Sequence, residues 1–196
     1  FAAAIPNQFM NTALAFPMTL VNVPISAYGG GVVALPWEGV ILTAMALDAS
    51  GTPTNNDISE AFDDGVMVIA SGQVAIKPFG LVGHQNVGGY WSNKTRISLI
   101  QDPSNVANFL LKEKFPLLGN PGPILERILE RFAPFLLNPV RPPNRENSTW
   151  SVFYGFDQYF WQPAGDPKRG IGMFFNFGAA DGDTSPVKYS YATGIG

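Results

Sequence analysis

Few residues in this sequence are suited to catalysis or metal binding. His84 is the only histidine and the chain has no cysteine, so neither a histidine-rich nor a thiolate metal site can form. A Ser-His-Asp arrangement would depend on His84 alone, without a nucleophile elbow of the G-x-S-x-G type. We therefore predict no catalytic residue, no metal site and no cofactor, and we expect His84 to have a structural role beside a turn.

Three other motifs have simple structural explanations. The DGD at 181 to 183 lacks the further oxygen ligands of a calcium loop, and the GGG at 29 to 31 lacks the Lys-Ser or Lys-Thr of a phosphate loop. We interpret them as a loop tip and a bend in a strand. The acid pair Asp63 and Asp64 falls in a polar segment, where we expect both carboxylates to be solvated and not buried as an acid catalyst requires.

Hydrogen-bonding side chains recur at alternate positions of otherwise apolar stretches. In VMVIASGQVAIK, residues 66 to 77, apolar or small residues share one face while Ser71, Gln73 and Lys77 share the other. The candidates for a polar wall of this kind are Ser71, Gln73, Lys77, His84, Asn86, Asp157, Asn176 and Lys188. Each of these residues could simply contact water at a surface without binding a solute. As a set they indicate strands with one apolar face and one polar, hydrated face.

The stretch TWSVFYGFDQYFW, residues 149 to 161, raises the question of which solvent it faces. In a soluble core, Asp157 and Gln158 would need partners, because burying an unpaired carboxylate costs several kcal/mol. A strand with lipid on one face and water on the other would carry Asp157 at little cost. Trp150, Val152, Tyr154 and Phe156 would then face lipid.

The composition excludes several classes of protein. Of the 196 residues, 46% are hydrophobic and only 14% charged, against about 25% charged in a typical soluble domain. A net charge of -3 gives no field that attracts nucleic acid. No apolar run reaches the ~18 residues of a membrane-spanning helix. The start, FAAAIPNQF, lacks a signal peptide's positive region, so we expect a removed signal or a fragment.

The pattern predicts an all-β fold with seven strands and one long insertion. We place the strands at about 29 to 35, 39 to 47, 66 to 77, 84 to 93, 149 to 161, 170 to 180 and 187 to 196, with a short helix near 11 to 16. Residues 94 to 148 form a long loop with helical segments. Its amphipathic part, 123 to 133, carries an apolar stripe of Ile124, Leu125, Ile128, Leu129 and Phe132.

Short and long connections alternate along the chain. Turns at 36 to 38, 78 to 83 and 162 to 169 interleave with loops at 48 to 64, 94 to 148 and 181 to 186. Short turns at one rim and long loops at the other are typical of a transmembrane antiparallel up-and-down β-barrel with strands of ~10 residues. Tyr159 and Trp161 fall at the turn end, where an aromatic girdle is expected.

The segments YGFDQYFWQPAG, DPKRGIGMFFNFGAADGDTSPVKYSYATGIG and FGLVGHQNVGGYWSN resemble the carbohydrate-selective porins, the OprB family, of bacterial outer membranes. The resemblance implies a sixteen-stranded barrel in the outer membrane that passes sugars and small polar solutes passively and is not an enzyme. Seven strands are too few to close such a barrel, so we interpret residues 1 to 196 as a single barrel fragment. Expected partners are sugars and outer-membrane lipid, with a homotrimer left open.

The amphipathic helix suggests a constriction. If it folds into the pore, Glu126, Arg127, Glu130 and Arg131 present a mixed-charge face that suits neutral polyols better than ions. We therefore add Arg127 and Arg131 to the solute-contacting candidates; packing on the rim or on a neighbouring subunit is the alternative. Two other classes stay open: an outer-membrane β-barrel hydrolase, and a soluble β-sandwich binding module whose core would hold Val152, Phe156, Met173 and Phe175.

Overall fold

The computed structural model of the chain describes residues 17–24, 27–50, 58–164 and 169–196. The short helix expected near residues 11 to 16 lies outside these ranges. The chain divides into two compact units: the first comprises residues 1–96 and 146–196, and the second is Ile97–Arg145.

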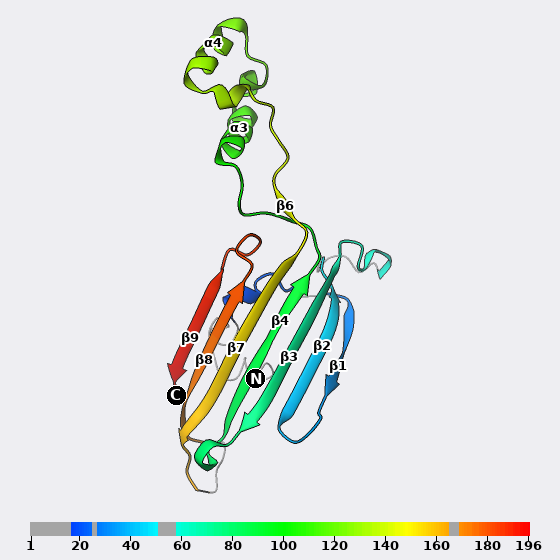
Figure 1. Cartoon of the computed structure of the whole chain (residues 1–196), viewed down its shortest axis with the longest axis vertical. Helices are drawn as coiled ribbons and strands as arrows, with labels where there is room; N and C mark the ends of the chain where they lie inside the picture. Colours follow the sequence, from blue (N-terminus) through cyan, green and yellow to red (C-terminus); the bar gives the residue numbers. More distant parts are fainter. Residues whose placement is uncertain (1–16, 25–26, 51–57, 165–168) are drawn as a thin grey trace. The chain divides into compact units, whose positions relative to one another are not determined.

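The first unit is built on one seven-stranded antiparallel sheet (Figure 1). Its strands are β1 (Gly29–Ala34), β2 (Val40–Asp48), β3 (Val66–Ile76), β4 (Gly83–Ser92), β7 (Thr149–Trp161), β8 (Ile171–Ala180) and β9 (Tyr189–Ile195), paired in that order. All seven expected strands are confirmed, within three residues at each end. Two short strands that the sequence did not predict, β5 (Arg96–Ile97) and β6 (Arg145–Glu146), pair with each other.

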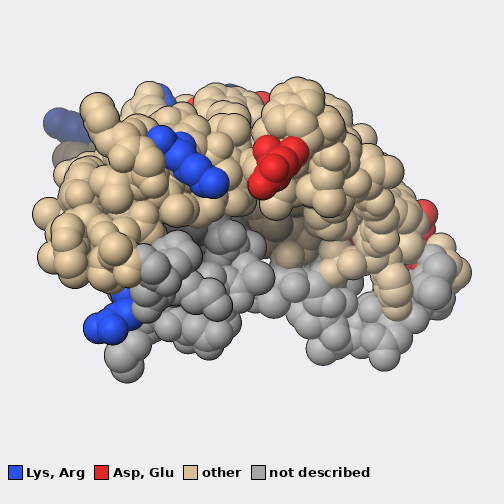
Figure 2. Space-filling model, turned by 90° about the horizontal axis from the view of Figure 1, so that it is seen from below, with Lys and Arg blue, Asp and Glu red and all other residues tan. Residues whose placement is uncertain are grey.

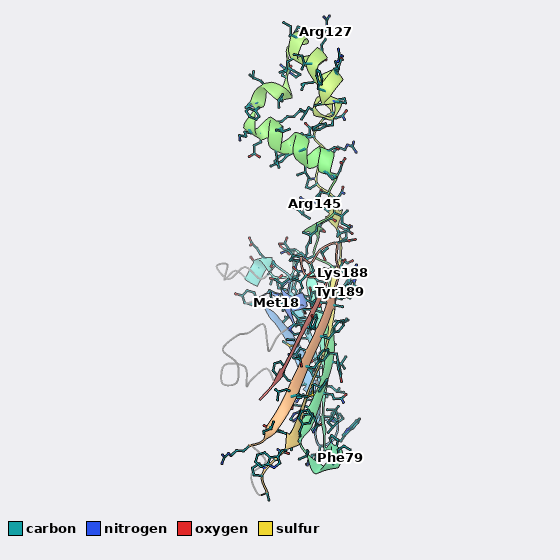
Figure 3. The ribbon with its side chains drawn as sticks, turned by 90° about the vertical axis from the view of Figure 1, so that its left-hand side faces the viewer. Met18, Phe79, Arg127, Arg145, Lys188 and Tyr189 are labelled. Carbon is teal, nitrogen blue, oxygen red and sulfur yellow. The ribbon has the colours of Figure 1, made fainter. Side chains whose placement is uncertain are left out.

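Tight connections close one end of the sheet. Gly39, with a φ of 80°, completes the turn between β1 and β2, and a 3₁₀ turn, η4 (Pro78–Gly80), joins β3 to β4. Gly80 has a φ of 81°, a conformation that glycine adopts without the steric cost of a Cβ. This end, where Phe79 lies, is called the turn end; the opposite end, where Tyr189 lies, is called the loop end (Figure 3).

The strand register places polar residues from neighbouring strands on one face of the sheet. Gln73 pairs with Asn86, Asn86 with Gly155 and Gly155 with Asn176, and residues directly opposite one another in a sheet share a face. Val68, Val74 and Val87 lie on the other face, each in a row that crosses several strands. The alternation predicted from the sequence is therefore continuous across neighbouring strands.

The sheet is curved, and its polar face is the concave one. In Figure 3 the edge strands β1 (blue) and β9 (red) lie on the same side of the central strands as Met18. The residues beside Met18 contact the polar face, because a Cβ added at Gly178, on the Asn176 side of β8, would meet Pro17 and overlap Thr19. We call the two faces the concave polar face and the convex apolar face.

The convex face carries large apolar side chains that remain exposed. Val87 is 59% exposed, Val152 48% and Tyr191 80%. A soluble sandwich would cover these residues with a second layer, yet among the described residues the only other sheet is the β5–β6 pair. The described sheet is open, with β1 and β9 at its edges. It confirms the expected antiparallel up-and-down strands, and closure into a barrel stays a prediction.

The second unit contains α3 (Pro103–Lys114) and α4 (Pro123–Phe132), followed by the 3₁₀ turns η5 (Pro116–Gly119) and η6 (Pro134–Leu137) respectively. Asp102 caps α3 by accepting from the Ser104 N–H at 2.9 Å. Within the expected stripe of α4, Leu129 is buried, whereas Ile124, Ile128 and Phe132 are exposed. Among the described residues, neither helix is long and apolar enough to cross a membrane.

Candidate functional site

A row of amide side chains crosses four strands of the concave polar face. Gln73, Asn86 and Asn176 come from β3, β4 and β8, and Gly155 of β7 occupies the position between the last two. A Cβ at Gly155 would lie 2.5 Å from Asn176 Oδ1, so the glycine leaves room for the Asn176 side chain. This amide row offers both donors and acceptors along one line.

The next row toward the turn end pairs a base with an acid. His84 of β4 lies opposite Asp157 of β7, and its Nδ1 is 2.9 Å from Asp157 Oδ2. The two side chains are 36% and 26% exposed, so both remain open to solvent. Together with the amide row they line a shallow depression that includes Gln73, His84, Asn86, Asp157 and Asn176.

Two aromatic side chains flank the amide row on the same face. The Phe153 ring lies over Gly88, where an added Cβ would meet its Cζ at 2.7 Å, and the Phe174 ring lies over Gly194, with its Cζ at 3.0 Å. Phe153 is one row toward the loop end and Phe174 one row toward the turn end. Polar groups between aromatic rings suit a sugar, whose hydroxyls need hydrogen bonds and whose ring has an apolar face.

Sequence reasoning missed these two phenylalanines. Both lie in stretches that are apolar at nearly every position, TWSVFYGFDQYFW and GIGMFFNFG, so composition gives no contrast between the faces. The available signal was register: counting in twos from Asp157 and Asn176 assigns Phe153 and Phe174 to the polar side.

The structure distributes the predicted site residues over three locations. Six lie on the concave polar face: Ser71, Gln73, His84, Asn86, Asp157 and Asn176. Lys77 and Lys188 are exposed just outside β3 and β9, and Lys188 Nζ lies 5.7 Å from the centre of the Tyr189 ring (Figure 3). Arg127 and Arg131 are exposed on α4 in the second unit.

Gln158 also has a clear role in the structure, on the convex face. Its Nε2 donates to three backbone carbonyls, those of Leu81, Val82 and Tyr159, with the shortest contact 2.9 Å to Tyr159. The other amide on that face, Gln85, accepts from the Tyr154 hydroxyl at 3.4 Å. Asp157 and Gln158 therefore face opposite sides, and each has a partner.

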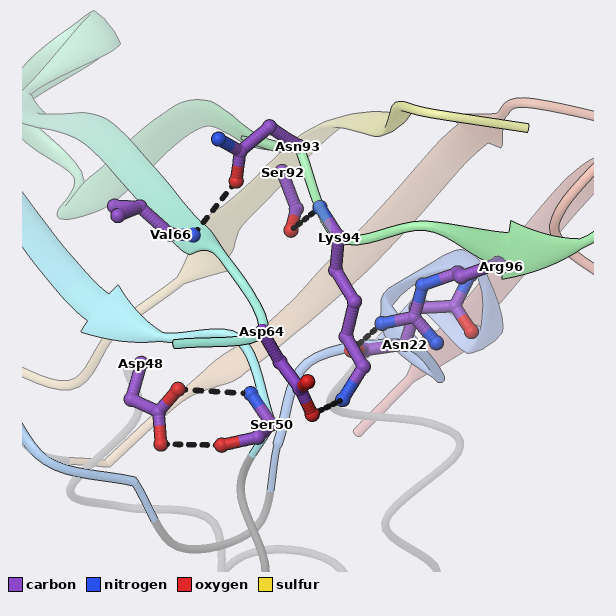
Figure 4. Close-up of polar contacts among 9 residues, drawn as sticks. All are labelled: Asn22, Asp48, Ser50, Asp64, Val66, Ser92, Asn93, Lys94 and Arg96. Atoms are coloured by element: carbon purple, nitrogen blue, oxygen red, sulfur yellow. Dashed lines mark hydrogen bonds and ion pairs between the residues drawn. The ribbon is translucent and has the colours of Figure 1, made fainter. Parts of the chain in front are cut away.

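A second polar cluster lies at the loop end. Lys94 Nζ is 3.4 Å from Asp64 Oδ2, and the Val66 N–H donates to Asn93 Oδ1 at 2.7 Å. The Arg96 guanidinium donates to the Asn22 carbonyl at 3.4 Å (Figure 4). These contacts join the long connections to the strand ends and hold the loop end of the sheet in place.

Among the described residues, few charged side chains are visible from the turn end. In Figure 2, which views the molecule from that side, the described surface is mostly uncharged, with a few separate Lys, Arg, Asp and Glu side chains. Phe79, Phe160 and Trp161 are exposed there. At the loop end of the convex face, Trp91 of β4 lies opposite Trp150 of β7. Tyr189 and Tyr191 lie near the start of β9, on the same face.

Among the described residues, the site has two possible members of a catalytic triad and no metal-binding cluster. His84 and Asp157 could form two members of a triad, but over the described ranges the structure has no hydroxyl hydrogen-bonded to the histidine. Within the same ranges, no group of three or more His, Asp and Glu side chains could hold a metal ion. The arrangement offers hydrogen bonding and aromatic contact to a polar solute.

Comparisons with known proteins identify a family and a similar fold. The chain matches the family described as "Carbohydrate-selective porin, OprB family" over residues 1–196. A solved structure of Pseudomonas putida OprB, in a high-pH form, is similar in fold, with a TM-score of 0.58 and 18% identity. That match covers 89% of this chain and 36% of the P. putida chain. No curated protein matches the sequence.

Proposed function

Since the chain belongs to the carbohydrate-selective porin (OprB) family of the bacterial outer membrane, we propose that its sheet forms part of the wall of a channel through which sugars diffuse. The observation that carries this proposal is the opposition of the two faces. The concave face holds the amide row and the His84–Asp157 pair, while the convex face exposes large apolar side chains.

The curvature supports a barrel over a flat or sandwiched sheet. Bending toward the polar face puts hydrogen-bonding groups inside and apolar groups outside, as a water-filled barrel in a bilayer requires. The edges at β1 and β9 must be paired, because an unpaired backbone group in hydrocarbon costs several kcal/mol. We therefore propose that further strands complete a barrel, with sixteen in all as the family resemblance implies.

We propose that the convex face contacts lipid directly. Exposed aromatic residues gather near both strand ends: Trp91, Trp150 and Tyr191 at the loop end, Phe79 and Trp161 at the turn end. Aromatic rings at these two levels suit the two membrane interfaces. The homotrimer remains a prediction, which native mass measurement in detergent would check.

For the solute, we propose that the amide row and His84–Asp157 bind sugar hydroxyls while Phe153 and Phe174 contact the ring. A set of mixed donors and acceptors with little net charge favours neutral polyols. In the second unit, Arg127 and Arg131 remain candidates for a narrower part of the path. Diffusion through a channel is passive, so we propose that the protein has no enzymatic activity.

Liposome swelling tests the proposal. Protein extracted from outer membranes with detergent and reconstituted into liposomes should let monosaccharides and disaccharides enter, with rates that fall as the sugar grows. Release of the protein from membranes by salt alone, or liposomes that exclude every sugar, would contradict it.

A further inference from the structure

A short segment near the start of the described chain packs on the concave polar face. Residues 17–24, called the inner strap, contain one 3₁₀ turn, η2 (Met18–Leu20), held by the Leu20 N–H donating to the Pro17 carbonyl at 3.0 Å. Thr19 at its centre is completely buried. Gly178 of β8 makes this contact possible, because an added Cβ would overlap Thr19 and lie 2.8 Å from Pro17 Cβ.

Polar contacts tie the other half of the strap to the loop end. The Asn22 side chain donates from Nδ2 to the Thr184 carbonyl at 3.2 Å, and the Asn22 carbonyl accepts from Arg96 (Figure 4). Thr184 in turn bonds to the buried Thr149 at the start of β7. The strap is thereby connected to residues near both β4 and β7.

Apolar contacts complete its attachment. Leu20 and Val23 pack against the cluster of Ala49, Met67 and Tyr90, all three of which are buried. Met67 and Tyr90 lie on the concave face of β3 and β4. Buried apolar contact on one side and hydrogen bonds on the other give the strap a fixed position within the first unit.

Within the described part of the chain, two apolar side chains of the strap are exposed. Met18 is 49% and Val21 54% exposed, and Figure 3 shows Met18 on the concave side of the sheet. Gly178, beneath the strap, and Asn176, of the amide row, are two residues apart on one strand, which is about 7 Å. The strap therefore borders the amide row on its loop side.

From this geometry we infer that the inner strap is the loop-side wall of the sugar site, and that it narrows the solute path with the apolar side chains of Met18 and Val21. The inference rests on the proposed function, because the concave face must be the lumen. In this proposal the inner strap, which is not a strand of the sheet, selects solutes by their size. The amide row would bind hydroxyls, and the strap would limit the solutes that reach it.

Thiol labelling tests the inference, since the chain has no cysteine. In Met18→Cys, a neutral methanethiosulfonate reagent about the size of a monosaccharide should lower single-channel conductance by about twofold or more, because it occupies the narrowed path. The matched control is Tyr191→Cys, an exposed position toward the same end but on the convex face, where labelling should leave conductance unchanged. Reduction should restore the Met18→Cys channel, which excludes misfolding as the cause.

The outcomes separate the two proposals. Channels that keep full conductance after Met18→Cys is labelled, or a cysteine at 18 that does not react, would overturn the role of the strap while the channel stands. Unmodified protein that forms no channel would contradict the proposed function itself, and the inner strap would lose its role with it.

Discussion

Asn86 and Gln85 are adjacent amides of β4 that face opposite sides of the sheet. Asn86 belongs to the depression on the concave face, whereas Gln85 is hydrogen-bonded to Tyr154 on the convex face. Chemically similar side chains one residue apart therefore lie on faces for which we propose different solvents. Comparing substitutions of the two residues therefore separates an effect on sugar binding that is specific to the concave face from the effect of removing any amide of β4.

Replacing Asn86 should weaken sugar binding. A lost hydrogen bond is worth about 1 kcal/mol, so Asn86→Ala should raise the sugar concentration that half-blocks single-channel current about fivefold. Gln85→Ala is the control and should leave that concentration unchanged. Equal effects of the two substitutions would contradict the assignment of the amide row.

Much of the concave polar face was predictable at the residue scale because a strand has a fixed period of two. Once Asp157 and Asn176 are placed on one side, Gln73, His84 and Asn86 follow from register. Lys77 and Lys188 lie outside the strand ends, where the period stops. The inner strap could not be predicted, because Pro17 and Pro24 bound a short turn with no repeating pattern.

At the scale of elements, each strand has one face proposed to meet lipid and one proposed to meet water. A charge on the lipid side has to be moved out of water, which costs about 2–4 kcal/mol for Arg or Lys at the middle of the bilayer. On the water side the same charge remains solvated. The loss of unfolding free energy caused by a lysine substitution therefore indicates which face a position occupies.

Lysine substitutions in β4 test this difference. Val87→Lys should lower the free energy of unfolding by about 2 kcal/mol or more, because the charge meets hydrocarbon, while Asn86→Lys should change it little. Urea unfolding in lipid vesicles, followed by tryptophan fluorescence, measures both variants. A larger loss for Asn86→Lys would reverse the assignment of the faces.

The helical unit supplies a separate test at the element scale. Arg127 and Arg131 are exposed on α4, and the proposed constriction places them near solute. Arg127→Glu with Arg131→Glu should shift the ion selectivity of the channel toward cations and alter sugar block, because the pore would then carry more negative charge. Unchanged conductance, selectivity and sugar block would remove these residues from the solute path.

The helical unit also marks a limit of prediction from sequence. The apolar stripe of α4 correctly located a helix, because a period of 3.6 is a local property of the chain. The burial of Leu129 beside exposed Ile124 and Phe132 depends on neighbouring turns, and these carry no comparable period. Periodicity identifies an amphipathic helix but does not identify what covers its apolar face.

At the scale of the whole molecule, the central claim is that the concave face contacts water and the convex face contacts lipid. The seven strands and their pairing order follow from alternating side chains and from short turns that place successive strands side by side. Barrel closure depends on partners for β1 and β9, so it stands as a proposal. The solvent on each face can be measured directly without assuming closure.

Cysteine scanning along β3 in intact outer membranes is that measurement. Single cysteines at Ala70, Ser71, Gln73 and Val74 are exposed to a membrane-impermeant maleimide, and the labelled fraction is determined by mass. We predict labelling at Ser71 and Gln73, on the face proposed to contact water, and protection at Ala70 and Val74, on the face proposed to contact lipid. Labelling at Ala70 and Val74 with protection at Ser71 and Gln73, or equal labelling at all four, would contradict it.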